Sequence, residues 1–405
     1  MRSERAVIGL VGAVQFVNIL DFMMVIPLGP DFGRSLGVPL DQLGVVAGAY
    51  TLSAGVTGLL LSPLLDKADR RTALFVCMMG LAAGTALGGF ATDFRSLVVT
   101  RVLAGAFGGP ATSVALAIVA DVIPPERRGR AMGSVMGAFS IASVLGVPAG
   151  LFLAELAVWR APFFAVAGAG VVISASATWL LPSLRGHLVR GAEVGAAVPR
   201  LLRDGVVWAA LGATAAATLS AFIAIPNLSA FIQFNLAWPR EHLGWLYMAG
   251  GTLSFVGLRV FGRLIDRFGP RALVIGGTAG FSVIAMLWWV LDPPPVPVYL
   301  LFPAMMLSMS ARNVAHQSLL SLVAPPAERA AFQSLNSATQ HLTSAFAAFA
   351  GTLLLTTSPT GALIGMRNVG FVSLIAATAV PFLLRAVQSR VRRASKTPEQ
   401  ISSMG

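Results

Sequence analysis

The chain has 405 residues, of which 56% are hydrophobic and only 11% are charged, and its mean hydropathy is +0.78. Soluble domains carry roughly 25% charged residues, so this composition excludes an ordinary water-soluble fold. The formal net charge of +12 is spread over short loops, which indicates membrane topology and anionic lipid rather than nucleic acid, and the single cysteine, Cys77, excludes a disulfide framework.

Apolar runs long enough to cross about 30 Å of hydrocarbon as helices follow one another along the chain. We expect twelve membrane-spanning helices, at residues 6–28, 43–65, 72–91, 97–123, 131–154, 161–181, 206–234, 243–264, 272–291, 298–323, 330–355 and 362–384. The predicted fold class is therefore an all-α polytopic membrane protein.

Lysine and arginine gather in alternate connecting segments, and such segments stay on the cytoplasmic side. If both termini are cytoplasmic, only Arg34, Arg95, Arg160 and Arg240 lie in the outer loops. An even number of spans with both ends inside is the predicted topology.

The first and fourth predicted helices carry opposite charges at similar depth. Asp21 lies seven residues before Leu28, about 10 Å along a helix, and Arg101 lies four residues after Leu97, about 6 Å from the same side. A pair is therefore feasible, and Asn18 shares the face of Asp21. A buried carboxylate beside an arginine can take up and release a proton as its surroundings change. A static bridge between two helices is the alternative.

The loop after the second helix concentrates charge. Asp66 can accept hydrogen bonds from the next helix and from Arg70 and Arg71, and Asp121 is a further possible partner of these arginines. A second copy of the loop contains Asp266, Arg267 and Arg271. We expect a latch between two conformations, with a plain topology anchor as the alternative. Asp69 stands where the second copy has Gly269, and aspartate tolerates a left-handed backbone there.

The fifth helix carries small residues at Gly133, Gly137, Gly146 and Gly150, and Pro148 removes one backbone hydrogen bond. The pattern predicts a bent helix that seals a gate, or simply a tight helix contact.

Polar residues also enter the predicted helices of the second half. Together with Asn18, Asp21 and Arg101 of the first half, those expected to line a wet cavity and bind the substrate are Asn227, Arg312, Asn313, His316, Gln317, Asn336, Gln340 and His341. Arg312 shares a face with His316, and Asn313 shares one with Gln317. Arg312 is too deep to reach water at either surface, so it must meet an anion, a carbonyl or cavity water, or pair with Asp21.

The chain repeats itself at an offset of 200 positions, from Pro39 to Pro239 and from Asp66 to Asp266. We infer two half-molecules, residues 1–184 and 206–405, joined by a cytoplasmic linker at 185–205. In membranes such halves face each other across a central site.

The segments 62–71 and 262–271 resemble the loop signature of the major facilitator superfamily. Arg101-Val102-Leu103-Ala104-Gly105 is similar to the fourth-helix motif of that superfamily, and the stretch from Gly146 to Gly150 is similar to its fifth-helix antiporter motif. The stretch from Asn18 to Met24 resembles the first helix of the bacterial twelve-helix drug and sugar exporters.

This resemblance implies two six-helix bundles in the bacterial cytoplasmic membrane and proton-coupled export of a small organic molecule by alternating access. It implies no enzymatic activity, no cofactor and no metal, and a functional monomer. Other readings of the sequence are an organic-anion carrier, favoured by Arg101 and Arg312 outnumbering Asp21, and a sugar exporter. From other classes, a lipid flippase and a non-transporting sensor stay open.

Overall fold

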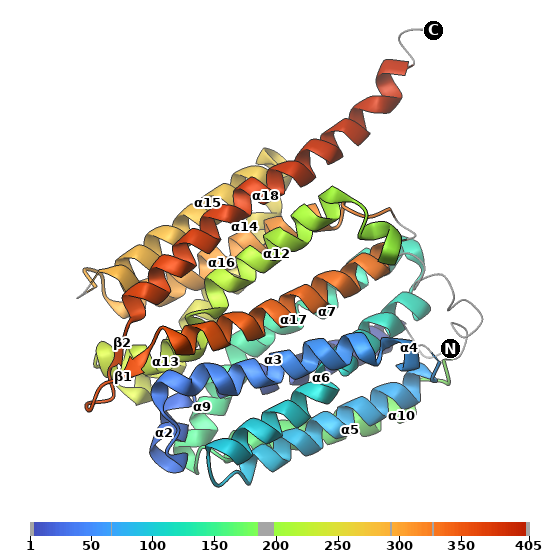
Figure 1. Ribbon diagram of the computed structural model, residues 1–405. Helices are drawn as coiled ribbons and strands as arrows, with labels where there is room; N and C mark the ends of the chain where they lie inside the picture. Colours follow the sequence, from blue (N-terminus) through green and yellow to red (C-terminus); the bar gives the residue numbers. More distant parts are fainter. Residues whose placement is uncertain (1–3, 66, 185–197, 292–293, 326–327, 402–405) are drawn as a thin grey trace.

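The computed structural model describes residues 4–65, 67–184, 198–291, 294–325 and 328–401, and almost all of them are helical. Figure 1 shows long helices that run side by side along one direction, with the last of them, α18, extending beyond the rest. The only strands among the described residues are β1 (Thr356–Thr357) and β2 (Leu363–Ile364), which form an antiparallel pair.

The first half follows the predicted order of spans. Its elements are α1 (Glu4–Val25), α2 (Gly29–Leu36), η1 (Leu40–Gln42), α3 (Leu43–Leu60), α4 (Ser62–Leu65), α5 (Arg70–Gly89), α6 (Phe94–Val122), α7 (Pro125–Met136), α8 (Ala138–Ile141), η2 (Ala142–Gly146), α9 (Val147–Leu156) and α10 (Ala161–Leu180).

The second half repeats this order with more interruptions. Its helical elements are α12 (Gly205–Phe222), η4 (Ile225–Asn227), α13 (Leu228–Ala230), η5 (Phe231–Asn235), η6 (Arg240–His242), α14 (Leu243–Phe268), α15 (Pro270–Ala285), η7 (Met286–Val290), α16 (Val298–Leu320), α17 (Arg329–Leu353) and α18 (Met366–Ile401).

Several predicted spans are not continuous helices, and two of them are interrupted beside a proline. The predicted helix 131–154 is divided by η2, a π-helical turn in which Val147 donates its N–H to Ala142 O immediately before Pro148. A proline cannot donate to the preceding turn, and a π turn absorbs the mismatch. The predicted helix 206–234 is interrupted at η4, where Pro226 occupies the second position of a 3-10 turn.

Eight helical segments of the described chain are long and apolar enough to cross a membrane. The other predicted spans, which correspond to α7–α9, α14, α16 and α17, are interrupted or carry more polar residues. Three of these, α9, α14 and α17, lie where the two halves meet, since α17 packs against α3 and α14 packs against α9 and η2. Lower hydropathy is therefore found at the seam between the halves, where a helix does not face lipid.

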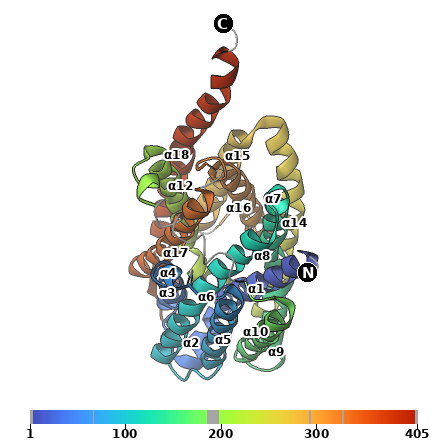
Figure 2. The same cartoon turned by 90° about the vertical axis from the view of Figure 1, so that its right-hand side faces the viewer.

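Within each half, neighbouring helices pack closely: α3 on α6 and α5 on α6 in the first half, and α12 on α18 and α15 on α16 in the second. Glycines allow the closest approaches. A Cβ at Gly105 or Gly109 would overlap the carbonyl oxygen of Tyr50 or Ala54 on α3. Figure 2 shows the two halves stacked, with α3 and α17 at their junction.

The bundle has two different ends. We call the end that carries α2, β1, β2 and η6 the hairpin end, and the opposite end, where α1 and α12 begin, the basic end. One hydrophobic cluster runs through the first half and continues into the hairpin end of the second half, where it includes Leu228 and Trp288. A separate cluster, with Val207, Leu319 and Leu384, fills the basic end of the second half. The two halves therefore share one core at the hairpin end.

Candidate functional site

Asp21 on α1 and Arg101 on α6 form an ion pair inside the first half. Arg101 Nη1 lies 3.2 and 3.3 Å from the two carboxylate oxygens, and the side chains are 0% and 1% exposed. Thr85 on α5 donates a hydrogen bond of 2.7 Å to Asp21 Oδ1, and the Arg101 guanidinium lies 5.1 Å from the centre of the Phe163 ring. Arg101 Nε and Nη2 are buried without a hydrogen-bond partner. The carboxylate is thus held by one charge and one hydroxyl, without contact with bulk water.

Asn18 lies one turn from Asp21 and joins three helices. Its Nδ2 donates to Gly108 O at 2.7 Å and to Thr112 Oγ1 at 2.8 Å, and its Oδ1 accepts from the Tyr50 hydroxyl at 2.8 Å. Phe22 lies beside Tyr50 with ring centres 5.5 Å apart, and it stacks on Phe222 of α12 at 5.9 Å. This aromatic contact connects the Asn18 and Asp21 region to the second half.

Arg312 on α16 has a different environment. Its side chain is 1% exposed, donates to Ser220 Oγ at 3.0 Å and to Ala217 O at 3.1 Å, and lies 4.7 Å from the centre of the Phe281 ring. Of the partners predicted for Arg312, a carbonyl is present, whereas Asp21 pairs with Arg101 instead. Arg312 therefore connects α16 to α12 and α15 and does not open toward the seam between the halves.

The other polar residues of α16 lie on two faces. His316 and Asn336 are buried with Thr214, which donates to Asn336 Oδ1 at 2.6 Å and lies 3.4 Å from His316 Nε2. Asn313 and Gln317 are exposed on another face of the helix. The set predicted to line one cavity is therefore split.

The remaining predicted substrate residues are scattered. Asn227 is fully buried in η4, and neither polar atom of its side chain has a hydrogen-bond partner. Gln340 is exposed on α17, and His341 lies where α17 approaches α3, close to Gly55. None of these three contacts Asp21 or Arg312 through a hydrogen bond found in the described chain.

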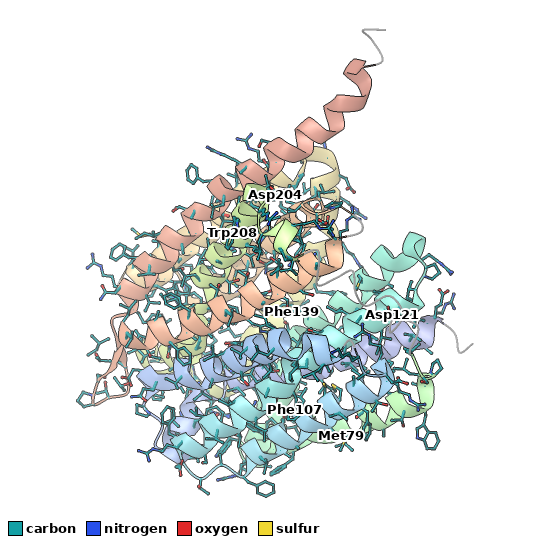
Figure 3. All side chains as sticks on the ribbon, turned by 45° about the vertical axis from the view of Figure 1, so that its right-hand side comes forward. Met79, Phe107, Asp121, Phe139, Asp204 and Trp208 are labelled. Carbon is teal, nitrogen blue, oxygen red and sulfur yellow. The ribbon has the colours of Figure 1, made fainter. Side chains whose placement is uncertain are left out.

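At the basic end, Asp121 pairs with Arg70. The Arg70 Nε and Asp121 Oδ2 atoms are 3.4 Å apart, and Figure 3 labels Asp121 at the end of α6. Asp66 lies outside the described residues. In the second copy of the loop, Asp266, Arg267 and Arg271 are exposed, and Arg267 lies over its neighbour Phe268. The predicted Arg70 contact therefore stays within the first half and does not join the two halves.

Asp69 departs from the expected backbone. With φ −60° and ψ 123° its backbone is extended rather than left-handed, whereas Gly269 has a φ of +76°. The Asp69 carboxylate caps α5 by accepting from Arg71 N at 2.9 Å, and it also accepts from Leu184 N at 3.2 Å and from the Ser183 hydroxyl. The expectation of a left-handed turn is wrong here, because aspartate has acquired a capping role that glycine cannot fill.

The fifth span packs closely against both halves, but mostly through residues other than its glycines. Gly146 lies against Leu20 of α1, and a Cβ at Gly251 of α14 would come 3.0 Å from the backbone of Ser143 in η2. Pro148 follows the π turn, and Gly150 has no close neighbour that a Cβ would crowd. The close packing thus centres on η2 and Gly146, not on Gly150.

Contacts between the halves at the hairpin end were not predicted. Arg240 of η6 holds Asp31 of α2 through Nε at 2.9 Å and Nη2 at 2.7 Å, and its Nη1 lies 3.4 Å from Glu155 Oε1. Thr357 donates to Asp41 Oδ1 at 2.8 Å. Asp31, Glu155 and Arg240 lie far apart in sequence at the outer ends of different spans. Only their opposite charges on the same predicted side of the membrane could have suggested a contact.

The site also includes residues that carried no signal in the sequence, namely Thr85, Tyr50 and Ser220. Each is a common residue in an apolar helix, and only the fold brings it to Asp21, Asn18 or Arg312. In the described chain, no three His, Cys, Asp or Glu side chains come together to hold a metal ion.

Two helical halves with a buried ion pair and a polar, interrupted seam define a polytopic membrane transporter. The sequence pattern of the Major Facilitator Superfamily matches residues 11–224 and, a second time, residues 210–404, so the chain belongs to that family and each half carries its plan. The predicted fold class and family are confirmed.

Three known proteins illustrate the relationship. A chloramphenicol resistance protein of Streptomyces lividans is 30% identical over 68% of this chain and 71% of its own length. The inner membrane transport protein YdhP of Escherichia coli K12 is 29% identical over 64% of this chain and 66% of its own length. The crystal structure of a D-xylose-proton symporter superposes with a TM-score of 0.73 at 16% identity, covering 92% of this chain and 96% of that one. The last similarity concerns the fold alone.

Proposed function

We propose that this protein exports a small organic molecule from the bacterial cytoplasm in exchange for protons, by alternating access between two bundles, residues 1–184 and 206–405. Both termini and the basic end face the cytoplasm in this proposal, because most loop arginines and lysines lie at that end. The hairpin end then faces outward.

The observation that carries the proposal is the complete burial of Asp21 against Arg101 and Thr85. A buried charge pair is costly to form and is strongly disturbed when one partner loses its charge. Protonation of Asp21 would leave Arg101 without its counter-ion, so Arg101 would need another partner. Asn18 and Tyr50, one turn away, would transmit this change to Phe22 and to Phe222 of the second half.

The substrate class is proposed from the relatives. The Streptomyces relative is described as a chloramphenicol resistance protein, and a Mycobacterium tuberculosis relative as a chloramphenicol efflux pump. A neutral compound such as chloramphenicol fits an interior in which the buried charge of Arg101 is already balanced by Asp21. Chloramphenicol is therefore the first probe.

The test uses proteoliposomes with an imposed pH gradient. The wild type should accumulate chloramphenicol against its concentration gradient, and Asp21→Asn should lose this uphill transport while it keeps binding and substrate exchange at equal pH. Asp93→Asn is the matched control, because Asp93 only caps α6 through Ser96. Full uphill transport by Asp21→Asn would remove the coupling role. If the wild type binds chloramphenicol without moving it, a sensor replaces the exporter.

An organic anion is the second candidate substrate, because Arg312 has hydroxyl, carbonyl and aromatic partners but no carboxylate among the described residues. Competition between labelled chloramphenicol and a panel of organic anions separates the two candidates.

A further inference from the structure

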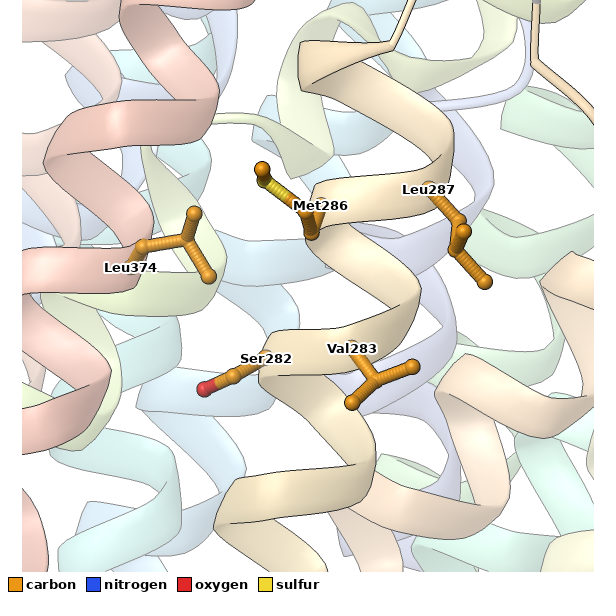
Figure 4. A pocket seen from close by; sticks show the side chains of 5 residues that line it. All are labelled: Ser282, Val283, Met286, Leu287 and Leu374. Carbon is orange, nitrogen blue, oxygen red and sulfur yellow. The ribbon is translucent and has the colours of Figure 1, made fainter.

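An apolar groove opens on the outer surface of the second half, away from the seam. It has a volume of about 330 Å³ and is lined by Ser282, Val283, Met286, Leu287 and Leu374. Figure 4 shows Ser282 and Met286 pointing from the α15–η7 helix toward Leu374 on α18. Its volume is many times the roughly 30 Å³ of a water molecule, but the lining offers water almost no hydrogen-bond partners.

The groove belongs to the bilayer-facing surface. Val283 and Met286 are exposed, as are Phe371 and Ile375 on the neighbouring turns of α18. In a helix that spans the membrane, such exposed apolar side chains face lipid. The groove lies where α15 passes into the π turn of η7, and α18 approaches η7 closely at Gly370.

The positively charged Arg367 lies on the same face of α18 as the groove, toward the hairpin end. Arg367, Phe371 and Leu374 are spaced four and three residues apart and so share one face of the helix. Arg367 lies 5.6 Å over the Phe371 ring, seven residues or about 10 Å above Leu374. The described chain contains no carboxylate in an ion pair with Arg367, and a cation in the first turn does not stabilise the helix itself.

We propose that this surface binds one anionic phospholipid from the leaflet at the hairpin end, with its phosphate at Arg367 and an acyl chain in the groove. The separation of about 10 Å between the charge and the groove along the helix places the apolar part of the ligand deeper than its headgroup, as in a phospholipid. The lipid would connect α15 to α18 within the second half, so its binding does not depend on the proposed substrate or on proton coupling.

The test is native mass spectrometry of the full-length protein with phosphatidylglycerol or with phosphatidylcholine of identical acyl chains. The wild type should retain one phosphatidylglycerol more tightly than phosphatidylcholine. Arg367→Gln should weaken the binding of phosphatidylglycerol about fivefold and leave the binding of phosphatidylcholine nearly unchanged, as expected for one arginine near the surface. Ser282→Leu, which adds a larger side chain to the groove, should weaken the binding of both lipids.

Arg259→Gln is the matched control, because Arg259 lies over Phe255 at the same 5.6 Å but on α14, away from the groove. It should bind both lipids like the wild type. An equal loss of phosphatidylglycerol affinity in Arg259→Gln and Arg367→Gln would overturn the proposal, because it would show that the overall surface charge attracts the lipid. Wild-type binding by both Arg367→Gln and Ser282→Leu, or a protein dimer abolished by Ser282→Leu, would overturn it as well.

Discussion

Arg240 and Asp31 belong to different halves of the molecule, and their side chains form a two-pronged ion pair at the hairpin end, with the guanidinium 18% and the carboxylate 13% exposed. The shared hydrophobic core and the bond from Thr357 to Asp41 lie at this same end. The halves are therefore joined where the proposed outer exit would open, and the structure corresponds to a state closed on that side.

Arg240→Ala should shift the population toward states open at the hairpin end. A hydrogen bond to a charged group contributes roughly 1.5–3 kcal/mol, and partial exposure to solvent weakens it, so the loss of this pair should change the ratio of the two states by at least about tenfold. Distances between spin labels at Ser35 and Thr360, in a Cys77→Ala background, would report the shift. Arg34→Ala is the control, because Arg34 is 55% exposed and lies 3.9 Å from the same Asp31 within one half. Unchanged distances in Arg240→Ala would contradict a gating role.

Thr85→Val should slow uphill transport while leaving substrate exchange at equal pH near the wild-type rate. The Thr85 hydroxyl orients Asp21 through a hydrogen bond of 2.7 Å, and a bond to a charged group contributes roughly 1.5–3 kcal/mol, which corresponds to a loss of about tenfold or more. Thr85→Ser should restore most of the rate. Thr100→Val is the control, since Thr100 bonds only to Leu97 O of its own helix. A wild-type rate in Thr85→Val would show that Asp21 needs no such support.

Spans and depth along a helix are contained in the sequence, whereas contacts between separate helices are not. Hydropathy and length predicted the spans, and depth along two helices was enough to bring Asp21 and Arg101 within reach of each other. Both arguments use distances along one helix, which a sequence contains directly.

Contacts that depend on how separate helices and loops are turned were not predictable. Arg312 was expected at a cavity, but the rotation of α16 directs it to Ser220 and leaves Asn313 exposed. The pairing of Arg240 with Asp31 depends on η6 and α2, which are brought together only by the assembled halves. The repeat led to a wrong prediction at Asp69. This position is an extended N-cap in the first copy, whereas the equivalent Gly269 has a left-handed backbone in the second.

Arg312→Ala should lower the unfolding temperature of the purified protein more than it lowers substrate affinity. Its removal breaks two buried hydrogen bonds from a charged group, each contributing roughly 1.5–3 kcal/mol, although Ser220 Oγ still donates to Ala217 O at 2.8 Å. Arg312→Lys should recover only part of the lost unfolding temperature, because an ammonium cannot replace the planar guanidinium that reaches both acceptors and stacks on Phe281. Thermal unfolding and equilibrium binding, measured on the same samples, check this. A stable Arg312→Ala variant with tenfold weaker binding of an organic anion would instead identify Arg312 as a substrate residue.

Gly105→Ala should destabilise the first half, because the added Cβ would overlap the carbonyl oxygen of Tyr50, and the backbone of α3 cannot turn aside like a side chain. Overpacking of this kind costs about 1–3 kcal/mol, and displacement of Tyr50 should also disturb its hydrogen bond to Asn18. We expect a lower unfolding temperature together with weaker transport. Gly168→Ala is the matched control, since a Cβ there meets nothing within 4 Å and alanine favours a helix by about 1 kcal/mol over glycine. Gly109→Ala, which would overlap Ala54 O in the same interface, should behave like Gly105→Ala. If both Gly105→Ala and Gly109→Ala unfold at the wild-type temperature, the close contact between α3 and α6 is not what holds Tyr50 against Asn18.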